Sequence, residues 1–216
     1  PGTTLPNSEV FISTEASGAG STAIGVMTTA SGHFASALGM TANASGAGAV
    51  AIGPVAKSSG EAGVAIGIAS QASAKKTIAV GSVAKATGEN AIAIGTGAQA
   101  TGKQSISVGT GNVVSGANSG AFGDPTTISG TGSYSTGNEN TITTNDTFVV
   151  GNNVTKTLDN SVFLGKDAAY TAKGASTDGN AAVTEPVTVG GTLTYGGFAG
   201  KTPVGVVSVG ADGKAR

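Results

Sequence analysis

Few residues of this chain could do catalytic chemistry. Among its 216 residues there is a single histidine, His33, and no cysteine. His33 lies at a corner of a repeat with no fixed acid or nucleophile near it, which is typical of a solvated loop histidine. The dinucleotide-binding loop, the phosphate loop and the nucleophile elbow are all absent from the sequence. We therefore predict that the chain is not an enzyme and has no catalytic residues.

Metal, cofactor and thiol chemistry also lack a pattern of suitable residues. The aspartates are scattered, whereas a calcium-binding solenoid would need them at a nine-residue period. Without cysteine the chain has no disulfide framework, and its redox compartment stays undecided. We expect no metal site and no bound cofactor.

Charge and hydropathy exclude two further classes of partner. The formal net charge is −1 and the lysines are spread along the chain, which argues against a nucleic-acid binder. No stretch is long enough to cross a membrane, and Pro1 does not open a secretory signal. If the protein is displayed on a cell surface, its signal and membrane anchor are expected outside this sequence.

The elements that position these side chains repeat every 14 residues. A second glycine precedes most of the repeat glycines by seven residues, with Ala74, Thr144 and Leu158 as exceptions. Such a fixed period predicts short units that bury a core only by stacking on their neighbours. The repeat glycines are Gly25, Gly39, Gly53, Gly67, Gly81, Gly95, Gly109, Gly123, Gly137, Gly151 and Gly165.

Each unit is predicted to hold two short strands and two turns. Ile and Val alternate with smaller residues, and seven residues between glycines are too few for a stable helix. Glycine supplies the positive φ or the close backbone approach that the corners need. The fold class is therefore all-β, a narrow parallel β-solenoid or β-roll whose eleven coils would extend for about 50 Å at ~4.8 Å per strand. The repeat does not reveal its hand.

Two columns of large apolar residues in the first strand are predicted to fill the coil interior, where each buried side chain contributes roughly 1.5–3 kcal/mol. The column one residue before the repeat glycine contains Ile24, Leu38, Ile52, Ile66, Val80, Ile94, Val108, Phe122, Val150 and Leu164. The column two residues earlier contains Val50, Val64, Ile78, Ile92, Ile106, Phe148 and Val162.

Between these columns lies a column of alanines, which we expect on the outside of the coil. A strand that is apolar on both faces needs cover on both, so this stripe predicts contact with another chain. The alternative is an alanine-rich surface on a monomer. The predicted interface residues are Ala23, Ala37, Ala51, Ala65, Ala79, Ala93 and Ala121.

The second strand alternates in the way that a half-exposed strand does. Its alanines are predicted to point inward, and a polar column is predicted to point outward as a candidate binding surface. Ser or Thr stands before the second corner of every unit, where its hydroxyl is expected to bond the local turn backbone. The polar column is Thr29, Asn43, Lys57, Gln71, Lys85 and Gln99.

Charge follows the same period. Glu61, Lys75, Glu89 and Lys103 occupy one position in four successive units. Stacking would place them in a column of alternating sign, in which a slip of one coil would bring like charges together.

The tandem copies of Ala-Ile-Ala-Ile-Gly followed by small residues resemble the YadA-like heads of trimeric autotransporter adhesins over residues 18–171. The resemblance implies a left-handed parallel β-roll, a homotrimer, and attachment of a Gram-negative outer-membrane fibre to host matrix proteins or cell-surface receptors. The tail from Gly205 to Arg216 is similar to the start of the neck below such heads.

The end of the repeat departs from this pattern. Val149 and Phe163 enlarge a column that is small elsewhere, and Tyr170 replaces a small residue, so we expect the roll to widen or its packing to change there. The predicted organisation is an N-terminal lead-in and cap at 1–17, the roll at 18–171, a strand-rich insert or cap over the roll's edge at 172–204, and the start of a neck at 205–216. Phe198 is expected to join these aromatic residues in a plug under the last coil.

Three functions fit these features. The first is an adhesive head that binds through a repeated outer face. The second is a passive spacer that projects other domains. The third is an ice-binding solenoid, suggested by the pairs Thr141/Thr143 and Thr155/Thr157, although Lys57 and Lys85 interrupt the threonine columns that it would need.

Overall fold

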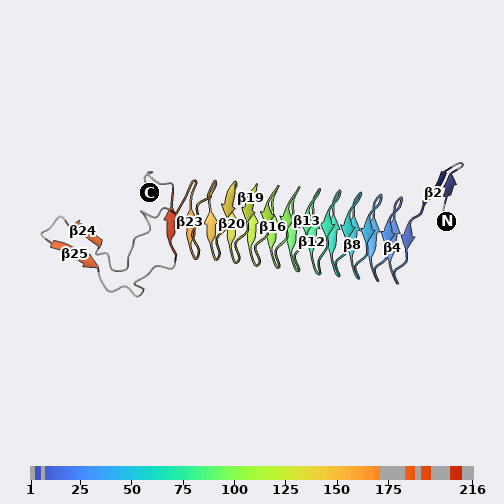
Figure 1. Ribbon diagram of the computed structural model, residues 1–216, viewed down its shortest axis with the longest axis horizontal. Coiled ribbons are helices and arrows are strands. Elements are labelled where there is room, and N and C mark those ends of the chain that lie inside the picture. The colour runs from blue at the N-terminus through green and yellow to red at the C-terminus, as the bar shows by residue number, and fades with distance from the viewer. Residues whose placement is uncertain (1–2, 6–7, 171–182, 188–190, 196–204, 211–216) are drawn as a thin grey trace.

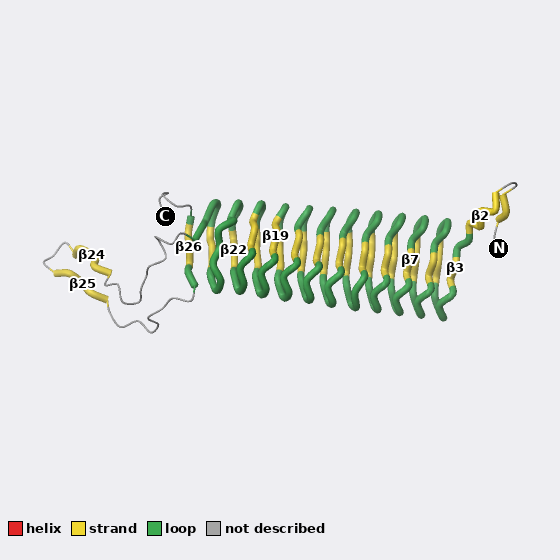
Figure 2. The backbone as a smooth tube through the Cα atoms, in the orientation of Figure 1, coloured by secondary structure: helices red, strands yellow, loops and turns green. Residues whose placement is uncertain are grey.

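The stacked coils form a rod, and most coils contribute one strand to each of two parallel sheets (Figure 1). Figure 2 shows that short strands alternate with turns through the whole stack. Neighbouring strands pair 14 residues apart, for example Val64 with Ile78 and Gln71 with Lys85. This register confirms the all-β solenoid with 14-residue coils. The computed structural model describes residues 3–5, 8–170, 183–187, 191–195 and 205–210.

Within the described residues the first sheet has twelve strands and the second has ten. The twelve-stranded sheet contains β4 (Thr22–Ile24), β6 (Ser36–Leu38), β8 (Val50–Ile52), β10 (Val64–Ile66), β12 (Ile78–Val80), β14 (Ile92–Ile94), β16 (Ile106–Val108), β18 (Gly120–Phe122), β20 (Tyr134–Thr136), β22 (Phe148–Val150), β23 (Val162–Leu164) and β26 (Val207–Val209). The ten-stranded sheet contains β3 (Glu15–Ala16), β5 (Thr29–Ala30), β7 (Asn43–Ala44), β9 (Lys57–Ser58), β11 (Gln71–Ala72), β13 (Lys85–Ala86), β15 (Gln99–Ala100), β17 (Val113–Val114), β19 (Thr126–Ile128) and β21 (Asn140–Ile142).

Two antiparallel strand pairs are not part of these two sheets. The first is β1 (Thr3–Leu5) with β2 (Ser8–Ile12). The second is β24 (Val183–Val187) with β25 (Gly191–Tyr195), which is the described part of the segment predicted to be a strand-rich insert.

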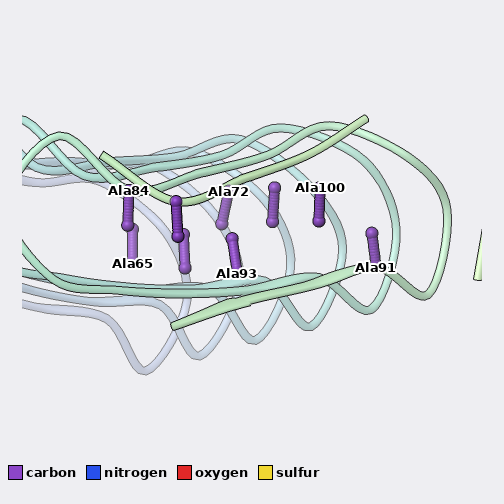
Figure 3. Packing of buried hydrophobic residues seen from close by; sticks show 9 residues of the cluster. Ala65, Ala72, Ala84, Ala91, Ala93 and Ala100 are labelled. Carbon is purple, nitrogen blue, oxygen red and sulfur yellow. The ribbon is translucent and has the colours of Figure 1, made fainter. Parts of the chain in front are cut away.

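The coil interior is lined by alanine, which reverses our assignment of the first strand. Ala65, Ala79 and Ala93 are fully buried and pack against Ala72, Ala86 and Ala100 of the opposite sheet (Figure 3). The large residues on either side of each alanine, such as Ile66 and Ile94, point outward. In the coils up to Ala100 the two sheets lie so close together that alanine methyl groups fill the space between them.

Larger side chains fill the interior toward the C-terminal end. Val149 and Phe163 are fully buried in a cluster with Ile128 and Ile142, and Tyr170 packs against its edge. The change in packing expected at these positions therefore takes place inside the chain. Phe198, which we expected to join them, lies outside the described residues.

Glycine has two different roles at the corners. The repeat glycine Gly95 has φ +127°, a conformation that side chains rarely adopt, and an added Cβ would lie 2.1 Å from the carbonyl oxygen of Gly109. Gly46, in the second glycine column, has no positive φ, but its Cβ would lie 2.1 Å from the oxygen of Gly60. The sequence expectation of positive φ or close approach is confirmed. Both apply to the first column from Gly25 to Gly137, whereas Gly46 in the second column has the close approach alone.

The last coil is completed from a distant part of the chain. Strand β26 (Val207–Val209) pairs in parallel with β23 (Val162–Leu164), and Ser208 is buried while Val207 and Val209 are exposed. The edge that we expected residues 172–204 to cover is thus covered by residues that we assigned to the start of a neck. Residues 211–216 lie outside the described residues.

Candidate binding surfaces

The outer face of the twelve-stranded sheet is apolar along most of its length. The first and third residues of each strand point outward, and large apolar side chains occupy the third position from Ile24 to Val209, with Thr136 as the polar exception. The side chains of Ile24, Ile66 and Ile94 are 58%, 36% and 40% exposed. An uncovered apolar surface of this length is unusual on a monomeric protein and marks a contact surface.

The alanine column that we predicted to be this contact surface is not available to another chain. Ala37 is 2% exposed, Ala23 is partly buried, and Ala51, Ala65, Ala79, Ala93 and Ala121 are completely buried within their own coils. A strand that is apolar on both faces still needs cover on its outer face. That outer face carries the Ile, Val and Leu side chains and not the alanines.

Sequence reasoning also missed an apolar corner in the first coils. Val26, Met40 and Ile68 follow their repeat glycines directly and are about half exposed. They extend the apolar outer face of the twelve-stranded sheet onto the corner of the coil that follows the repeat glycine. The available signal was that this position is apolar only in the early repeats, whereas Asp124 and Asn138 occupy it later.

Phe34 is the most exposed large apolar side chain among the described residues, at 77%. It lies at the opposite corner, adopts φ +56° and rests against Gly20 of the preceding coil. The position of this aromatic ring was not anticipated from the repeat.

The outer face of the ten-stranded sheet is polar. The predicted column of Thr29, Asn43, Lys57, Gln71, Lys85 and Gln99 points outward, with the two lysines exposed and the other four half-buried. The alanines on both sides of this column are buried. The alternation predicted for the second strand is therefore confirmed, and the column stays a proposal as a binding surface.

A second outward column of hydroxyl groups runs beside it, two residues further along each coil. We expected these hydroxyls to bond their local turns, and this expectation is wrong for most of them. In the described coils only Ser115 donates to a backbone oxygen, that of Ile128 at 3.4 Å, and Thr157 accepts a hydrogen bond from Thr144. Ser59, Ser73, Thr87 and Thr101 are exposed or half-buried on the outer face, and no side-chain hydrogen bond within the described residues involves their hydroxyls.

The charged column forms two ion pairs at one corner of the rod. Lys75 Nζ lies 2.9 Å from Glu61 Oε2, and Lys103 Nζ lies 3.3 Å from Glu89 Oε2. The hydrogen bond to Glu61 and its negative charge raise the pKa of Lys75 above its ordinary value. Because these side chains are about half exposed, the pairs contribute little stability.

Asparagine and aspartate side chains link the later coils. Asn138 Oδ1 accepts a hydrogen bond from the backbone N–H of Asp124 at 3.1 Å, and Asn152 Oδ1 accepts one from Asn138 N–H at 2.8 Å. Inside the roll, Asn140 Oδ1 accepts from Val154 N–H at 2.9 Å. These amides add hydrogen bonds between successive coils to the backbone pairing that is already present there.

Catalytic and metal-binding geometry was not expected, and His33 is exposed at a corner. Within the parts of the chain that the structure describes, no three His, Cys, Asp or Glu residues gather as a metal site. The described residues also include no helix long and apolar enough to cross a membrane.

Comparison with known proteins supports the repeat assignment. The family model described as "YadA head domain repeat (2 copies)" matches seven overlapping segments that together span residues 16–124. A search of curated proteins found no match. The matched segments coincide with coils whose outer faces are apolar on one sheet and polar on the other.

Proposed function

The chain belongs to the YadA head domain family of trimeric autotransporter adhesins, and from this membership we propose that it is the adhesive head of a homotrimeric fibre on a Gram-negative cell surface. Members of this family are surface-exposed and generally not enzymes. The observation that supports the proposal is the division of each coil into an apolar outer face and a polar outer face.

The apolar face supports association of three chains. Cyclic assembly lets each chain turn the outer face of its twelve-stranded sheet toward a common axis, where Ile66, Ile94 and their equivalents lose contact with water. Family membership favours three copies. In this arrangement the interface between chains is formed by the isoleucine columns and not by the predicted alanine column. The outer face of the ten-stranded sheet then faces solvent.

Replacing Ile66 and Ile94 together by glutamate is expected to dissociate the trimer while each coil stays folded. Both side chains point away from the coil interior, so the carboxylates destabilise only the contact between chains. Sedimentation velocity at micromolar concentration measures the oligomeric state. The matched control is Gln71→Glu with Gln99→Glu on the opposite sheet, which is expected to remain trimeric. A monomeric wild-type head, or a trimeric Ile66→Glu/Ile94→Glu head, would contradict this interface.

The polar face is the proposed adhesive surface. Its outward columns repeat at each coil, so a partner such as a host matrix protein or cell-surface receptor would make many weak contacts that add through multivalency. The residues proposed to contact the partner are Thr29, Asn43, Lys57, Gln71, Lys85 and Gln99.

Deleting two coils in phase, Glu61 to Gly88, is expected to leave a folded trimer with reduced adhesion. The deletion joins Gly60 to Glu89, which occupies the same repeat position as Glu61, so the neighbouring coils restack. Solid-phase binding to collagen, laminin, fibronectin, vitronectin and host cells measures adhesion. An out-of-phase deletion of one and a half coils, Glu61 to Gly81, serves as the control and should not fold into a regular rod.

A complete loss of adhesion by the in-phase deletion, with folding unchanged, would point to one discrete site instead of a repeated face. If the intact head bound none of these partners, the passive spacer would become the better description. Ice binding has less support, because lysine and glutamine occupy most of the column in which that function needs threonine.

A further inference from the structure

Two lysines lie in line on the polar face with one coil between them. Gln71 pairs with Lys57 on one side and with Lys85 on the other, and Lys85 pairs with Gln99. The two lysines are therefore two strand spacings apart, about 10 Å along the rod. Both are exposed on the outer face of the ten-stranded sheet.

The charge of these lysines is not neutralised by the protein. Residues 57–103 include five lysines and two glutamates, which is a net charge of +3. Both glutamates are already paired with lysines at the corner. Among the residues described by the structure, Lys57 and Lys85 form no ion pair, and the outward columns from Thr29 to Thr143 contain no carboxylate.

The neighbouring groups are suited to hydrogen bonding with a polymer of sugars. Ser59, Ser73 and Thr87 form a column parallel to the lysines on the outer face, and no side-chain hydrogen bond within the described residues involves their hydroxyls. Together with the amide of Gln71 they present donors and acceptors at every strand spacing. The two outward columns contain no aromatic residue from Thr29 to Thr143, so they offer no platform for stacking nucleic-acid bases.

We propose that this face binds a linear anionic polysaccharide that lies along the rod axis, with its sulfate or carboxylate groups at Lys57 and Lys85 and its hydroxyls at the adjacent Ser, Thr and Gln side chains. The proposal rests on the proposed adhesive function and names the chemical class of its ligand. An extended acidic peptide fits less well, because its side chains on one face recur at about 6.6 Å, which differs from the lysine spacing. A polysaccharide that has anionic groups in every disaccharide, as heparin and hyaluronan do, presents them with a repeat comparable to that spacing.

The test measures binding of the trimeric head to immobilised heparin, with hyaluronan as a polymer that has carboxylates only and dextran as an uncharged polymer. Wild type is expected to bind heparin, to lose binding as salt screens the charges, and to ignore dextran. The Lys57→Gln/Lys85→Gln variant places glutamine where Gln71 and Gln99 already stand, so the fold should be retained. Its affinity for heparin is expected to fall about tenfold.

The control variant is Lys76→Asn, which removes a positive charge from the corner and installs the residue that Asn90 provides one coil later at φ +58°. Its affinity should change less than twofold. Val113→Lys is expected to raise the affinity for heparin. Val113 pairs with Gln99, so a lysine there would add a third cation at the same spacing.

Three results would overturn the proposal: no binding of wild type to either anionic polymer, equal losses from Lys76→Asn and from the double variant, or competition by poly-glutamate as effective as that by heparin. The first of these, combined with adhesion to matrix proteins that declines in the two-coil deletion, would reject the polysaccharide and leave the adhesive head intact. A wild-type head that does not form trimers would contradict the proposed function itself.

Discussion

Replacement of Ala65 and Ala93 by glutamate is expected to unfold the central coils. Both alanines are completely buried against alanines of the opposite sheet, and an ionised carboxylate there would have neither space nor a partner. The expected loss is roughly 3–5 kcal/mol at each site, which together is comparable to the whole stability of a typical domain. Circular dichroism and hydrogen exchange of residues 57–103 measure the outcome.

The control for this experiment is Ala65→Ser. Serine already occupies the same column at Ser107, where it is buried and donates a hydrogen bond to the carbonyl oxygen of Asn112 at 3.3 Å. Ala65→Ser should therefore remain folded. If Ala65→Glu/Ala93→Glu stayed folded and only dissociated, the alanines would face a neighbouring chain, as the sequence alone had indicated.

Replacing Gly95 by alanine is expected to destabilise the roll by about 3–5 kcal/mol, the sum of a strained backbone conformation and a steric overlap. Its φ is +127°, and the added Cβ would lie 2.1 Å from the oxygen and 2.7 Å from the carbonyl carbon of Gly109. Because both atoms are backbone, the next coil would have to move as a whole. Denaturation at one fixed protein concentration measures the change.

Gly97 provides a matched control two residues away. Its φ is +67°, the nearest atom to an added Cβ is Gly111 Cα at 4.0 Å, and Ala69 holds the equivalent position two coils earlier at φ +53°. Gly97→Ala should cost only about 1 kcal/mol. Equal effects of the two substitutions would show that close approach between coils is not what requires glycine at position 95.

Some features were determined by local sequence because they depend on period and residue type alone. The 14-residue repeat predicted the coil length and the parallel register, and alternation in the second strand predicted which residues point outward. The column of Glu61, Lys75, Glu89 and Lys103 predicted ion pairs, of which two are present. Each of these follows from stacking identical units, so no knowledge of the coil's width is needed.

The sequence alone did not determine which face of the first strand is buried. Large and small residues alternate there with a period of two, and a strand places alternate side chains on opposite faces without indicating which face is the core. Hydrophobicity favoured Ile66 over Ala65 as the buried residue, but in the coils up to Ala100 the two sheets pack so closely that alanine methyl groups fill the space between them. The proposed interface therefore moved from the alanines to the isoleucines.

The completion of the roll by Val207–Val209 also depended on tertiary structure. Ser208-Val209-Gly210 repeats the motif of Ser107-Val108-Gly109, but Gly210 lies 45 residues after Gly165, which is not a multiple of 14. A search for glycines at a fixed period does not find this motif. In the folded chain the edge of the sheet binds Val207–Val209 through backbone hydrogen bonds, and the small side chain of Ser208 fits inside the coil. The sequence by itself determined the unit and its stacking, whereas the width of the coil and its exposed edge, which arise only when the chain folds, decided which side chains are buried and which segment closes the stack.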